Sequence, residues 1–103
     1  MIITKDSSFT EKEIEKGNKL AISSLAMDLK RIALGFHNGS EKTAKRFTQE
    51  ALKRREEISN PPPYLKKIIN ILPQALSQKD KQKLAEDALM YSTIFQNYVT
   101  KYL

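Results

Sequence analysis

Residues 20–37, LAISSLAMDLKRIALGFH, decide the fold of this chain. Apolar side chains recur in the stretch at alternating spacings of three and four, the period of a helix that is packed along its length. This main stripe consists of Ile22, Leu25, Leu29, Ile32 and Phe36. Asn38-Gly39 follows as a stop signal, since glycine readily adopts the left-handed conformation that ends a helix.

Outward from this stretch, Thr10 and Glu13 have the spacing of a capping box, in which each side chain bonds the other residue's amide. The sequence therefore predicts a helix from about Glu11 to about His37. Gly17 and Asn18 are poor helix formers, which leaves a later start open.

The same helix carries a second apolar stripe, formed by Leu20, Met27 and Leu34 at intervals of seven residues. At about 100° per residue this stripe lies on average about 140° from Ile22. The helix is thus apolar over more than half of its circumference. It either sits centrally in its own bundle or presents its outer face to a second chain, and the sequence leaves both alternatives open.

Three further helices follow. Ser40 is a good cap for a helix from about Glu41 to Ile58, which the three prolines of residues 61–63 must stop because proline lacks the amide donor. A short helix then covers residues 64–72, with a kink or a break expected at Pro73. Ser77 and Asp80 signal the start of a last helix, from about Lys79 to Tyr102.

The predicted fold class is all-α: a compact antiparallel helical bundle of three long helices plus one short helix. Residues 1–8 are predicted to be a flexible lead-in, and residues 9–103 a single helical-bundle domain. The sequence shows no strand-like alternation and no internal repeat.

The composition removes several classes of protein. The 103 residues include no cysteine, which excludes a disulfide framework, a thiolate zinc site and a cysteine nucleophile. No stretch approaches the ~20 apolar residues of a membrane span, and the first ten residues lack the apolar core of a signal peptide. We therefore expect a cytoplasmic protein without a membrane partner.

Candidate chemistry is sparse. His37 is the only histidine, so neither the Glu-x-x-His pairs of di-iron bundles nor the zinc motif His-Glu-x-x-His is present. The glycines are too scattered for a phosphate loop, and Ser23 and Ser24 lie inside a helix rather than on an exposed turn. We predict no metal, no cofactor and no catalytic residue.

The spacing of Arg31 and His37 indicates a possible enzymatic activity. Arg31 and His37, in the stretch RIALGFH, are placed as in the arginine-to-histidine motif that the HEPN-type helical ribonucleases carry, and the stretch resembles that motif. The resemblance implies an all-α fold and RNA cleavage by these two residues. It covers seven residues, and Ile32 follows the arginine where that family usually has a polar residue.

Positive charge gathers on the second predicted helix. The chain has a net charge of +6, and an excess of this kind favours anionic partners such as nucleic acid. Glu50 and Glu57 are spaced to pair with Arg54 and Lys53, as on an ordinary solvated helix face. The candidate phosphate-binding residues are Lys42, Lys45, Arg46, Lys53, Arg54 and Arg55.

The aromatic residues argue against base stacking, which needs exposed rings. Phe47, Tyr91, Phe95 and Tyr98 fall on the predicted core stripes.

Two hypotheses come from these patterns. The leading one is a non-enzymatic bundle that acts through protein–protein contacts, as a homodimer or with another protein, with Leu20, Met27 and Leu34 at the interface. The alternative is a nucleic-acid-binding module that uses the basic face of the second helix.

Overall fold

The fold is known from a computed structural model that describes residues 11–103. The predicted lead-in over residues 1–8 and the cap at Thr10 lie outside this range. The described part contains four α-helices, one short 3₁₀-helix and no strand, so the predicted all-α fold is confirmed. The elements are α1 (Glu11–His37), α2 (Glu41–Arg54), η1 (Arg55–Glu57), α3 (Pro63–Ala75) and α4 (Lys81–Tyr102).

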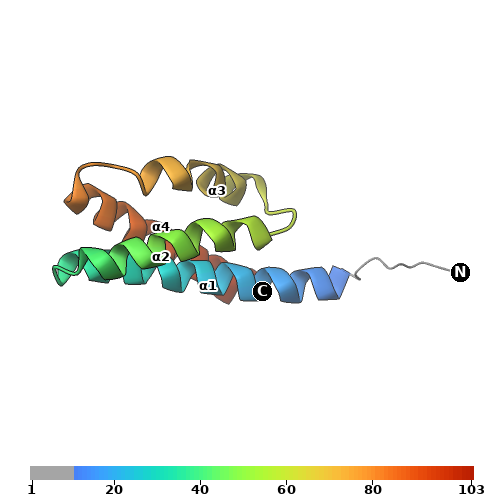
Figure 1. The fold of residues 1–103 in the computed structure, drawn as a ribbon. Helices are drawn as coiled ribbons and strands as arrows, with labels where there is room; N and C mark the ends of the chain where they lie inside the picture. Colours follow the sequence, from blue (N-terminus) through green and yellow to red (C-terminus); the bar gives the residue numbers. More distant parts are fainter. Residues whose placement is uncertain (1–10) are drawn as a thin grey trace, which may run out of the picture.

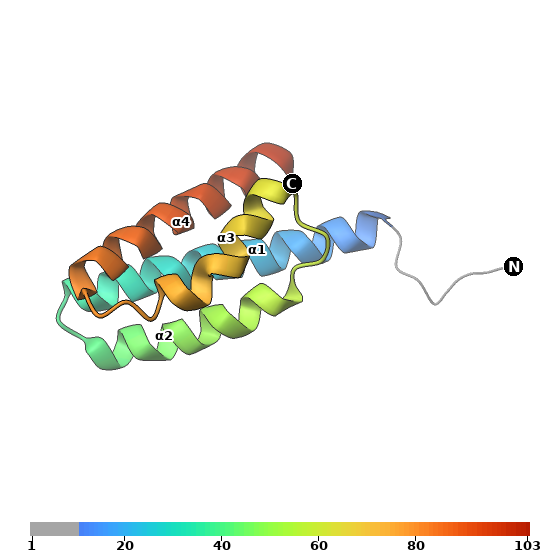
Figure 2. The ribbon, with the colours of Figure 1, turned by 90° about the horizontal axis from the view of Figure 1, so that it is seen from above.

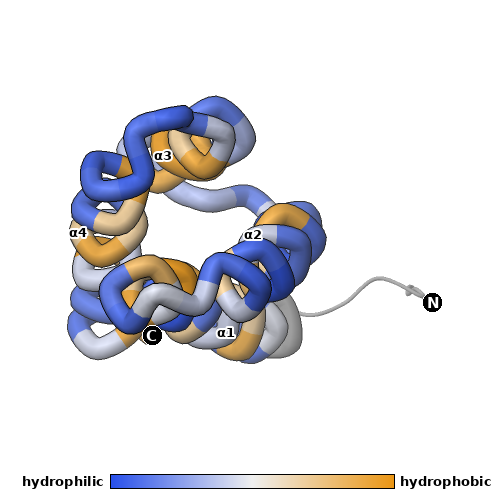
Figure 3. Tube along the Cα trace, turned by 60° about the vertical axis from the view of Figure 1, so that its left-hand side comes forward, coloured by the Kyte–Doolittle hydropathy of each residue, from blue (hydrophilic) through white to orange (hydrophobic). Residues whose placement is uncertain are grey.

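Consecutive helices run antiparallel, and short connections join them at the two ends of the bundle (Figures 1 and 2). Helix α1 packs against both α2 and α4. Seen nearly along the helices, the four surround a common axis, with α3 across from α1 (Figure 3). Helix α3 thus covers the side of the core that α1 does not reach.

The core lies along this axis and draws on all four helices. Leu25, Leu29 and Ile32 of the main α1 stripe are fully buried, as the spacing predicted. Phe95 of α4 and Leu72 of α3 are also fully buried. Burying side chains of this size is the main force that holds such a bundle together, at roughly 1.5–3 kcal/mol each.

Helix α1 has the predicted bounds, and Gly39 ends it at a φ of 75°. Asn18, a weak helix former, has a tertiary role that explains its position. Its side-chain amide donates to the Ser59 carbonyl at 2.6 Å, and its oxygen accepts from the Ser59 amide at 2.8 Å. This pair of hydrogen bonds ties α1 to the segment between η1 and α3.

Helices α1 and α2 come close together at Gly35. A β-carbon placed on Gly35 would lie 2.9 Å from the backbone nitrogen of Ala44, closer than real β-carbon contacts come. Ala44 and Ala51 are fully buried, so small residues line the α2 side of this contact. The absence of a side chain at Gly35 therefore sets the distance between the two helices.

Helix α2 is shorter than predicted. Its α-helical part ends at Arg54, and η1 replaces the expected last turn before Ile58. Ser40 precedes the helix as predicted but makes no capping hydrogen bond, and its hydroxyl donates to the Thr43 hydroxyl at 2.7 Å.

The interruption expected at Pro73 is not observed as a break, since α3 continues to Ala75. Proline cannot donate to the carbonyl four residues earlier, which here belongs to Ile69. The Arg55 guanidinium supplies the missing donor, with Nη1 3.4 Å from the Ile69 carbonyl oxygen. A side chain from η1 thus replaces the hydrogen bond that the proline removes.

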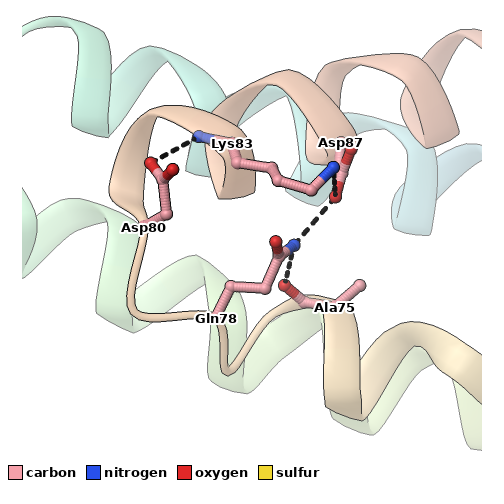
Figure 4. A network of polar contacts seen from close by, with 5 residues as sticks. All are labelled: Ala75, Gln78, Asp80, Lys83 and Asp87. Atoms are coloured by element: carbon pink, nitrogen blue, oxygen red, sulfur yellow. Dashed lines mark hydrogen bonds and ion pairs between the residues drawn. The ribbon is translucent and has the colours of Figure 1, made fainter.

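Polar contacts hold the connection between α3 and α4 (Figure 4). The Gln78 amide donates to the Ala75 carbonyl at 2.9 Å and to the Asp87 carboxylate at 2.8 Å. Asp80 caps α4 by accepting from the Lys83 amide at 3.1 Å. Helix α4 therefore begins at Lys81, two residues later than predicted.

None of the helices within residues 11–103 combines the length and the hydropathy that crossing a bilayer requires.

We expect Gly35→Ala to lower the free energy of unfolding by about 1–3 kcal/mol, because the new methyl group would press on the α2 backbone. Gly17→Ala is the matched control, since nothing lies within 4 Å of a β-carbon at Gly17. The control should gain about 0.5–1 kcal/mol from helix propensity alone. Urea unfolding followed by circular dichroism measures both, and equal effects would contradict the close approach.

We expect Arg55→Met to cost about 1 kcal/mol in the natural background, because it leaves the Ile69 carbonyl without a donor. In a Pro73→Ala background an alanine amide replaces Arg55 as the donor, so the same substitution should cost little. A double-mutant cycle by urea unfolding measures the coupling. Equal costs in the two backgrounds would show that Arg55 does not compensate for the proline.

Candidate functional site

The outer side of the α1–α4 pair exposes large apolar side chains. Leu20, Met27 and Leu34 are 65%, 50% and 46% exposed, so the second stripe of α1 lies at the surface and not in the core. On α4, Leu89 and Met90 are each 48% exposed. We call these five residues the α1–α4 face.

Leu89 is the central residue of this face, because it lines two shallow grooves between the helices. One groove, of about 670 Å³, brings Leu89 together with Leu34. The other, of about 370 Å³, brings it together with Met27. Met27, Leu34 and Leu89 thus contribute to one continuous surface, whereas Leu20 lines neither groove.

Small residues form the floor between the two helices. Ala26 and Ser92 are buried there, and the Ser92 hydroxyl donates to the Ala26 carbonyl at 2.6 Å. Ala33 and Ala85 line the groove closer to His37. Because these side chains are short, the larger apolar side chains stand along the groove edges, where a partner can reach them.

Lys30 and Glu86 place opposite charges on this surface. Lys30 lines the groove with Met27, and Glu86 lines the groove with Leu34. Neither takes part in an ion pair among residues 15–103. Lys81 also lines the groove with Leu34. A surface that carries charges of both signs can be complementary to a copy of itself across a two-fold axis.

Sequence reasoning found the α1 half of the face through its seven-residue spacing. It noted Leu89 only as a residue off the main α4 stripe, and it missed Met90. Met90 belongs to no apolar stripe of α4, so only the accessible surface identifies it.

The basic residues predicted on the second helix do not share one environment. Lys42, Lys45, Arg46 and Lys53 are exposed. Arg54 and Arg55 are half-buried and are directed at partners within the chain. Arg54 contacts Glu57 at 3.4 Å, and Arg55 bonds the Ile69 carbonyl. The exposed positive surface is therefore narrower than the sequence indicated.

Arg31 and His37 lie on different sides of α1. The Arg31 guanidinium faces α2, 5.2 Å from the centre of the Phe47 ring. His37 lines the groove toward α4 together with Lys81. Six helical residues separate the two by about 120° and about 9 Å of rise, so one chain does not bring them together.

Asp28 is a carboxylate in the α1–α2 contact, with only 6% of its surface exposed. Burial raises its pKa above the ordinary value, and Glu50 adds to the increase. Arg54 and Arg31 act in the opposite direction, and the Arg31 Nη1 lies 4.0 Å from Oδ1. The charged form of Asp28 is thus disfavoured in the fold despite the two nearby arginines.

Comparison with known proteins adds no relative. No protein-family model matches the chain, and no significant match was found among the curated proteins or among the solved structures.

We expect Asp28→Asn to raise the free energy of unfolding at pH 7, because it removes a buried charge. A folded-state pKa above the unfolded value means that the group's contribution to stability falls as pH rises through that pKa. The advantage of the variant should therefore shrink as pH is lowered toward 4. Urea unfolding between pH 4 and 7 measures it, with Glu15→Gln, at an exposed position, as the control. A less stable variant at pH 7 would show that the arginine pairing outweighs burial.

Proposed function

We propose that this chain is a non-enzymatic protein-interaction module that forms a symmetric dimer through the α1–α4 face. The observation that carries the proposal is the gathering of five large apolar side chains, each 46–65% exposed, on one side of two adjacent helices. On a small soluble domain, a cluster of exposed apolar side chains usually marks a site of interaction with another molecule.

A second copy is the occupant that the charges favour. In a two-fold symmetric dimer both copies use the same face, so each residue of the face lies against the corresponding face of the partner. In this arrangement Lys30 can pair with the partner's Glu86, while the apolar side chains on both copies are removed from water. Symmetric dimers are also the commonest closed assemblies.

The size of the face suggests the strength of the dimer. Leu20 to Leu34 covers about 21 Å along α1, and two adjacent helices are about 20 Å wide. This footprint lies at the small end of specific interfaces. We therefore expect a weak, reversible dimer of the transient class.

We expect the natural protein to sediment as a reversible dimer at concentrations of about 100 μM, and Met27→Glu or Leu89→Glu to shift it to monomer. Each substitution would place a charge in an apolar contact, while exposed positions allow the monomer to stay folded. Ile71→Glu is the matched control, because Ile71 is an exposed apolar residue of α3, outside the face. Sedimentation equilibrium measures the mass and circular dichroism the fold.

Two results would contradict the dimer: a natural protein that is monomeric at this concentration, or glutamate variants that associate like the control. Charge exchange tests the two-fold arrangement separately. Lys30→Glu or Glu86→Lys alone should weaken association, and the two together should restore it.

A further inference from the structure

Three tyrosines from two helices meet at one end of the bundle. The rings of Tyr64 on α3 and Tyr98 on α4 lie 6.1 Å apart between centroids, edge to face. Tyr98 also contacts Tyr102, with the centroids 5.3 Å apart. Tyr64 and Tyr102 are 49% and 61% exposed, whereas Tyr98 is half-buried between them. We call these residues the tyrosine cluster.

Tyr98 falls on a predicted core stripe, and no exposed aromatic platform was expected. The structure differs because Tyr64 and Tyr102, which are far apart in the sequence, both pack against Tyr98 once α3 folds against the end of α4. Two largely accessible rings beside a third, fixed ring form the kind of surface on which planar ligands stack.

Both helices that carry the rings also carry an exposed lysine close in sequence to a ring. Lys101 lies with its Nζ 5.6 Å from the centre of the Tyr102 ring. Lys67 is exposed one helical turn after Tyr64. The segments that carry the rings, residues 58–79 and 88–103, contain no acidic residue. Glu57, which precedes the first segment, is paired with Arg54.

The phenol of Tyr64 stays neutral at physiological pH. Burial raises the pKa of Tyr64, and the neighbouring Tyr102 and Tyr98 raise it further. The Tyr64 ring therefore adds no negative charge that would repel a phosphate backbone.

We propose that the tyrosine cluster binds single-stranded nucleic acid, with bases stacked on Tyr64 and Tyr102 and the backbone phosphates held by Lys67 and Lys101. Exposed aromatic rings combined with nearby cations are the two elements of sequence-independent single-strand binding. In a duplex the bases are stacked on one another, so no base face is free to stack on the tyrosine rings. This function goes beyond self-association, and its surface lies on the α3 side of α4, away from Leu89.

The test uses the full chain and fluorescein-labelled 12-mers of deoxythymidine and of uridine at low salt. Anisotropy should show binding to single strands and at least tenfold weaker binding to a 12-base-pair duplex. The chain has no tryptophan and four tyrosines, three of them in the cluster, so its intrinsic emission reports directly on stacking and should be quenched by unlabelled strands. Equal affinity for the two 12-mers would show that the site binds single strands in general. Tighter binding of the uridine 12-mer would show that its ligand is RNA.

Variants locate the site. Tyr64→Ala with Tyr102→Ala should weaken binding at least tenfold, because each stacked ring contributes about fivefold or more. Tyr64→Phe with Tyr102→Phe keeps both rings and should bind within twofold of the natural protein. Lys101→Glu should also weaken binding. Lys42→Gln with Lys45→Gln is the charge control: it changes the net charge by as much as Lys101→Glu does, but on the exposed face of α2. Its affinity should stay within twofold of the natural protein.

Several results would overturn the proposal. These are no binding at 100 μM protein, alanine variants that bind like the natural protein, duplex bound as tightly as single strands, or a loss that follows Lys42 and Lys45 instead of the tyrosines. Circular dichroism and sedimentation of the alanine variants separate this site from the α1–α4 face, since both fold and self-association should be unchanged.

Discussion

The close approach of α1 to its two neighbours is the constraint on which the rest of the structure depends. Gly35 lets the α1 backbone meet α2 at Ala44, and Ala26 meets Ser92 of α4 through a buried hydrogen bond. These contacts lie on either side of the main α1 stripe and direct it into the core. They also fix the opposite side of α1 toward solvent, because one helix cannot be covered all around by two neighbours. The exposure of Met27 is therefore a consequence of how α1 is held.

Periodicity predicted the parts of the fold that local sequence controls. The three-four spacing identified the buried stripe of α1, Gly39 placed the end of the helix, and the spacing of Thr10 and Glu13 placed its start near Glu11. The sequence indicated an interruption of α3 because Pro73 is a local signal. The donor that compensates for the proline comes from Arg55, which lies 14 residues before the Ile69 carbonyl that it bonds. The end of α2 was misplaced for a similar reason, since the sequence does not show where a helix tightens into a 3₁₀ turn.

The surface sites differ in the same way: sites on one helix could be predicted from the sequence, and sites that join two helices could not. Heptad spacing indicated Leu20, Met27 and Leu34, because a second stripe on one helix is visible without knowledge of its neighbours. The tyrosine cluster was not visible, since it joins α3 to α4. Arg54 and Arg55 read as surface charge in the sequence because a long side chain can turn either way, and only the packed structure shows that both turn toward partners within the chain.

Helix α4 connects the two proposed surfaces because it carries one on each side. On one side of α4, Ser92 contacts α1 and Leu89 belongs to the proposed dimer contact. On another side, Tyr98 contacts α3. A two-fold axis perpendicular to the helices would place the two tyrosine clusters at opposite ends of the dimer. Each would then engage its own strand or a distant part of the same strand, and such a pair of sites raises the effective affinity for long strands over short ones. Self-association would in this way serve the binding of extended nucleic acid without contributing a single contact to it.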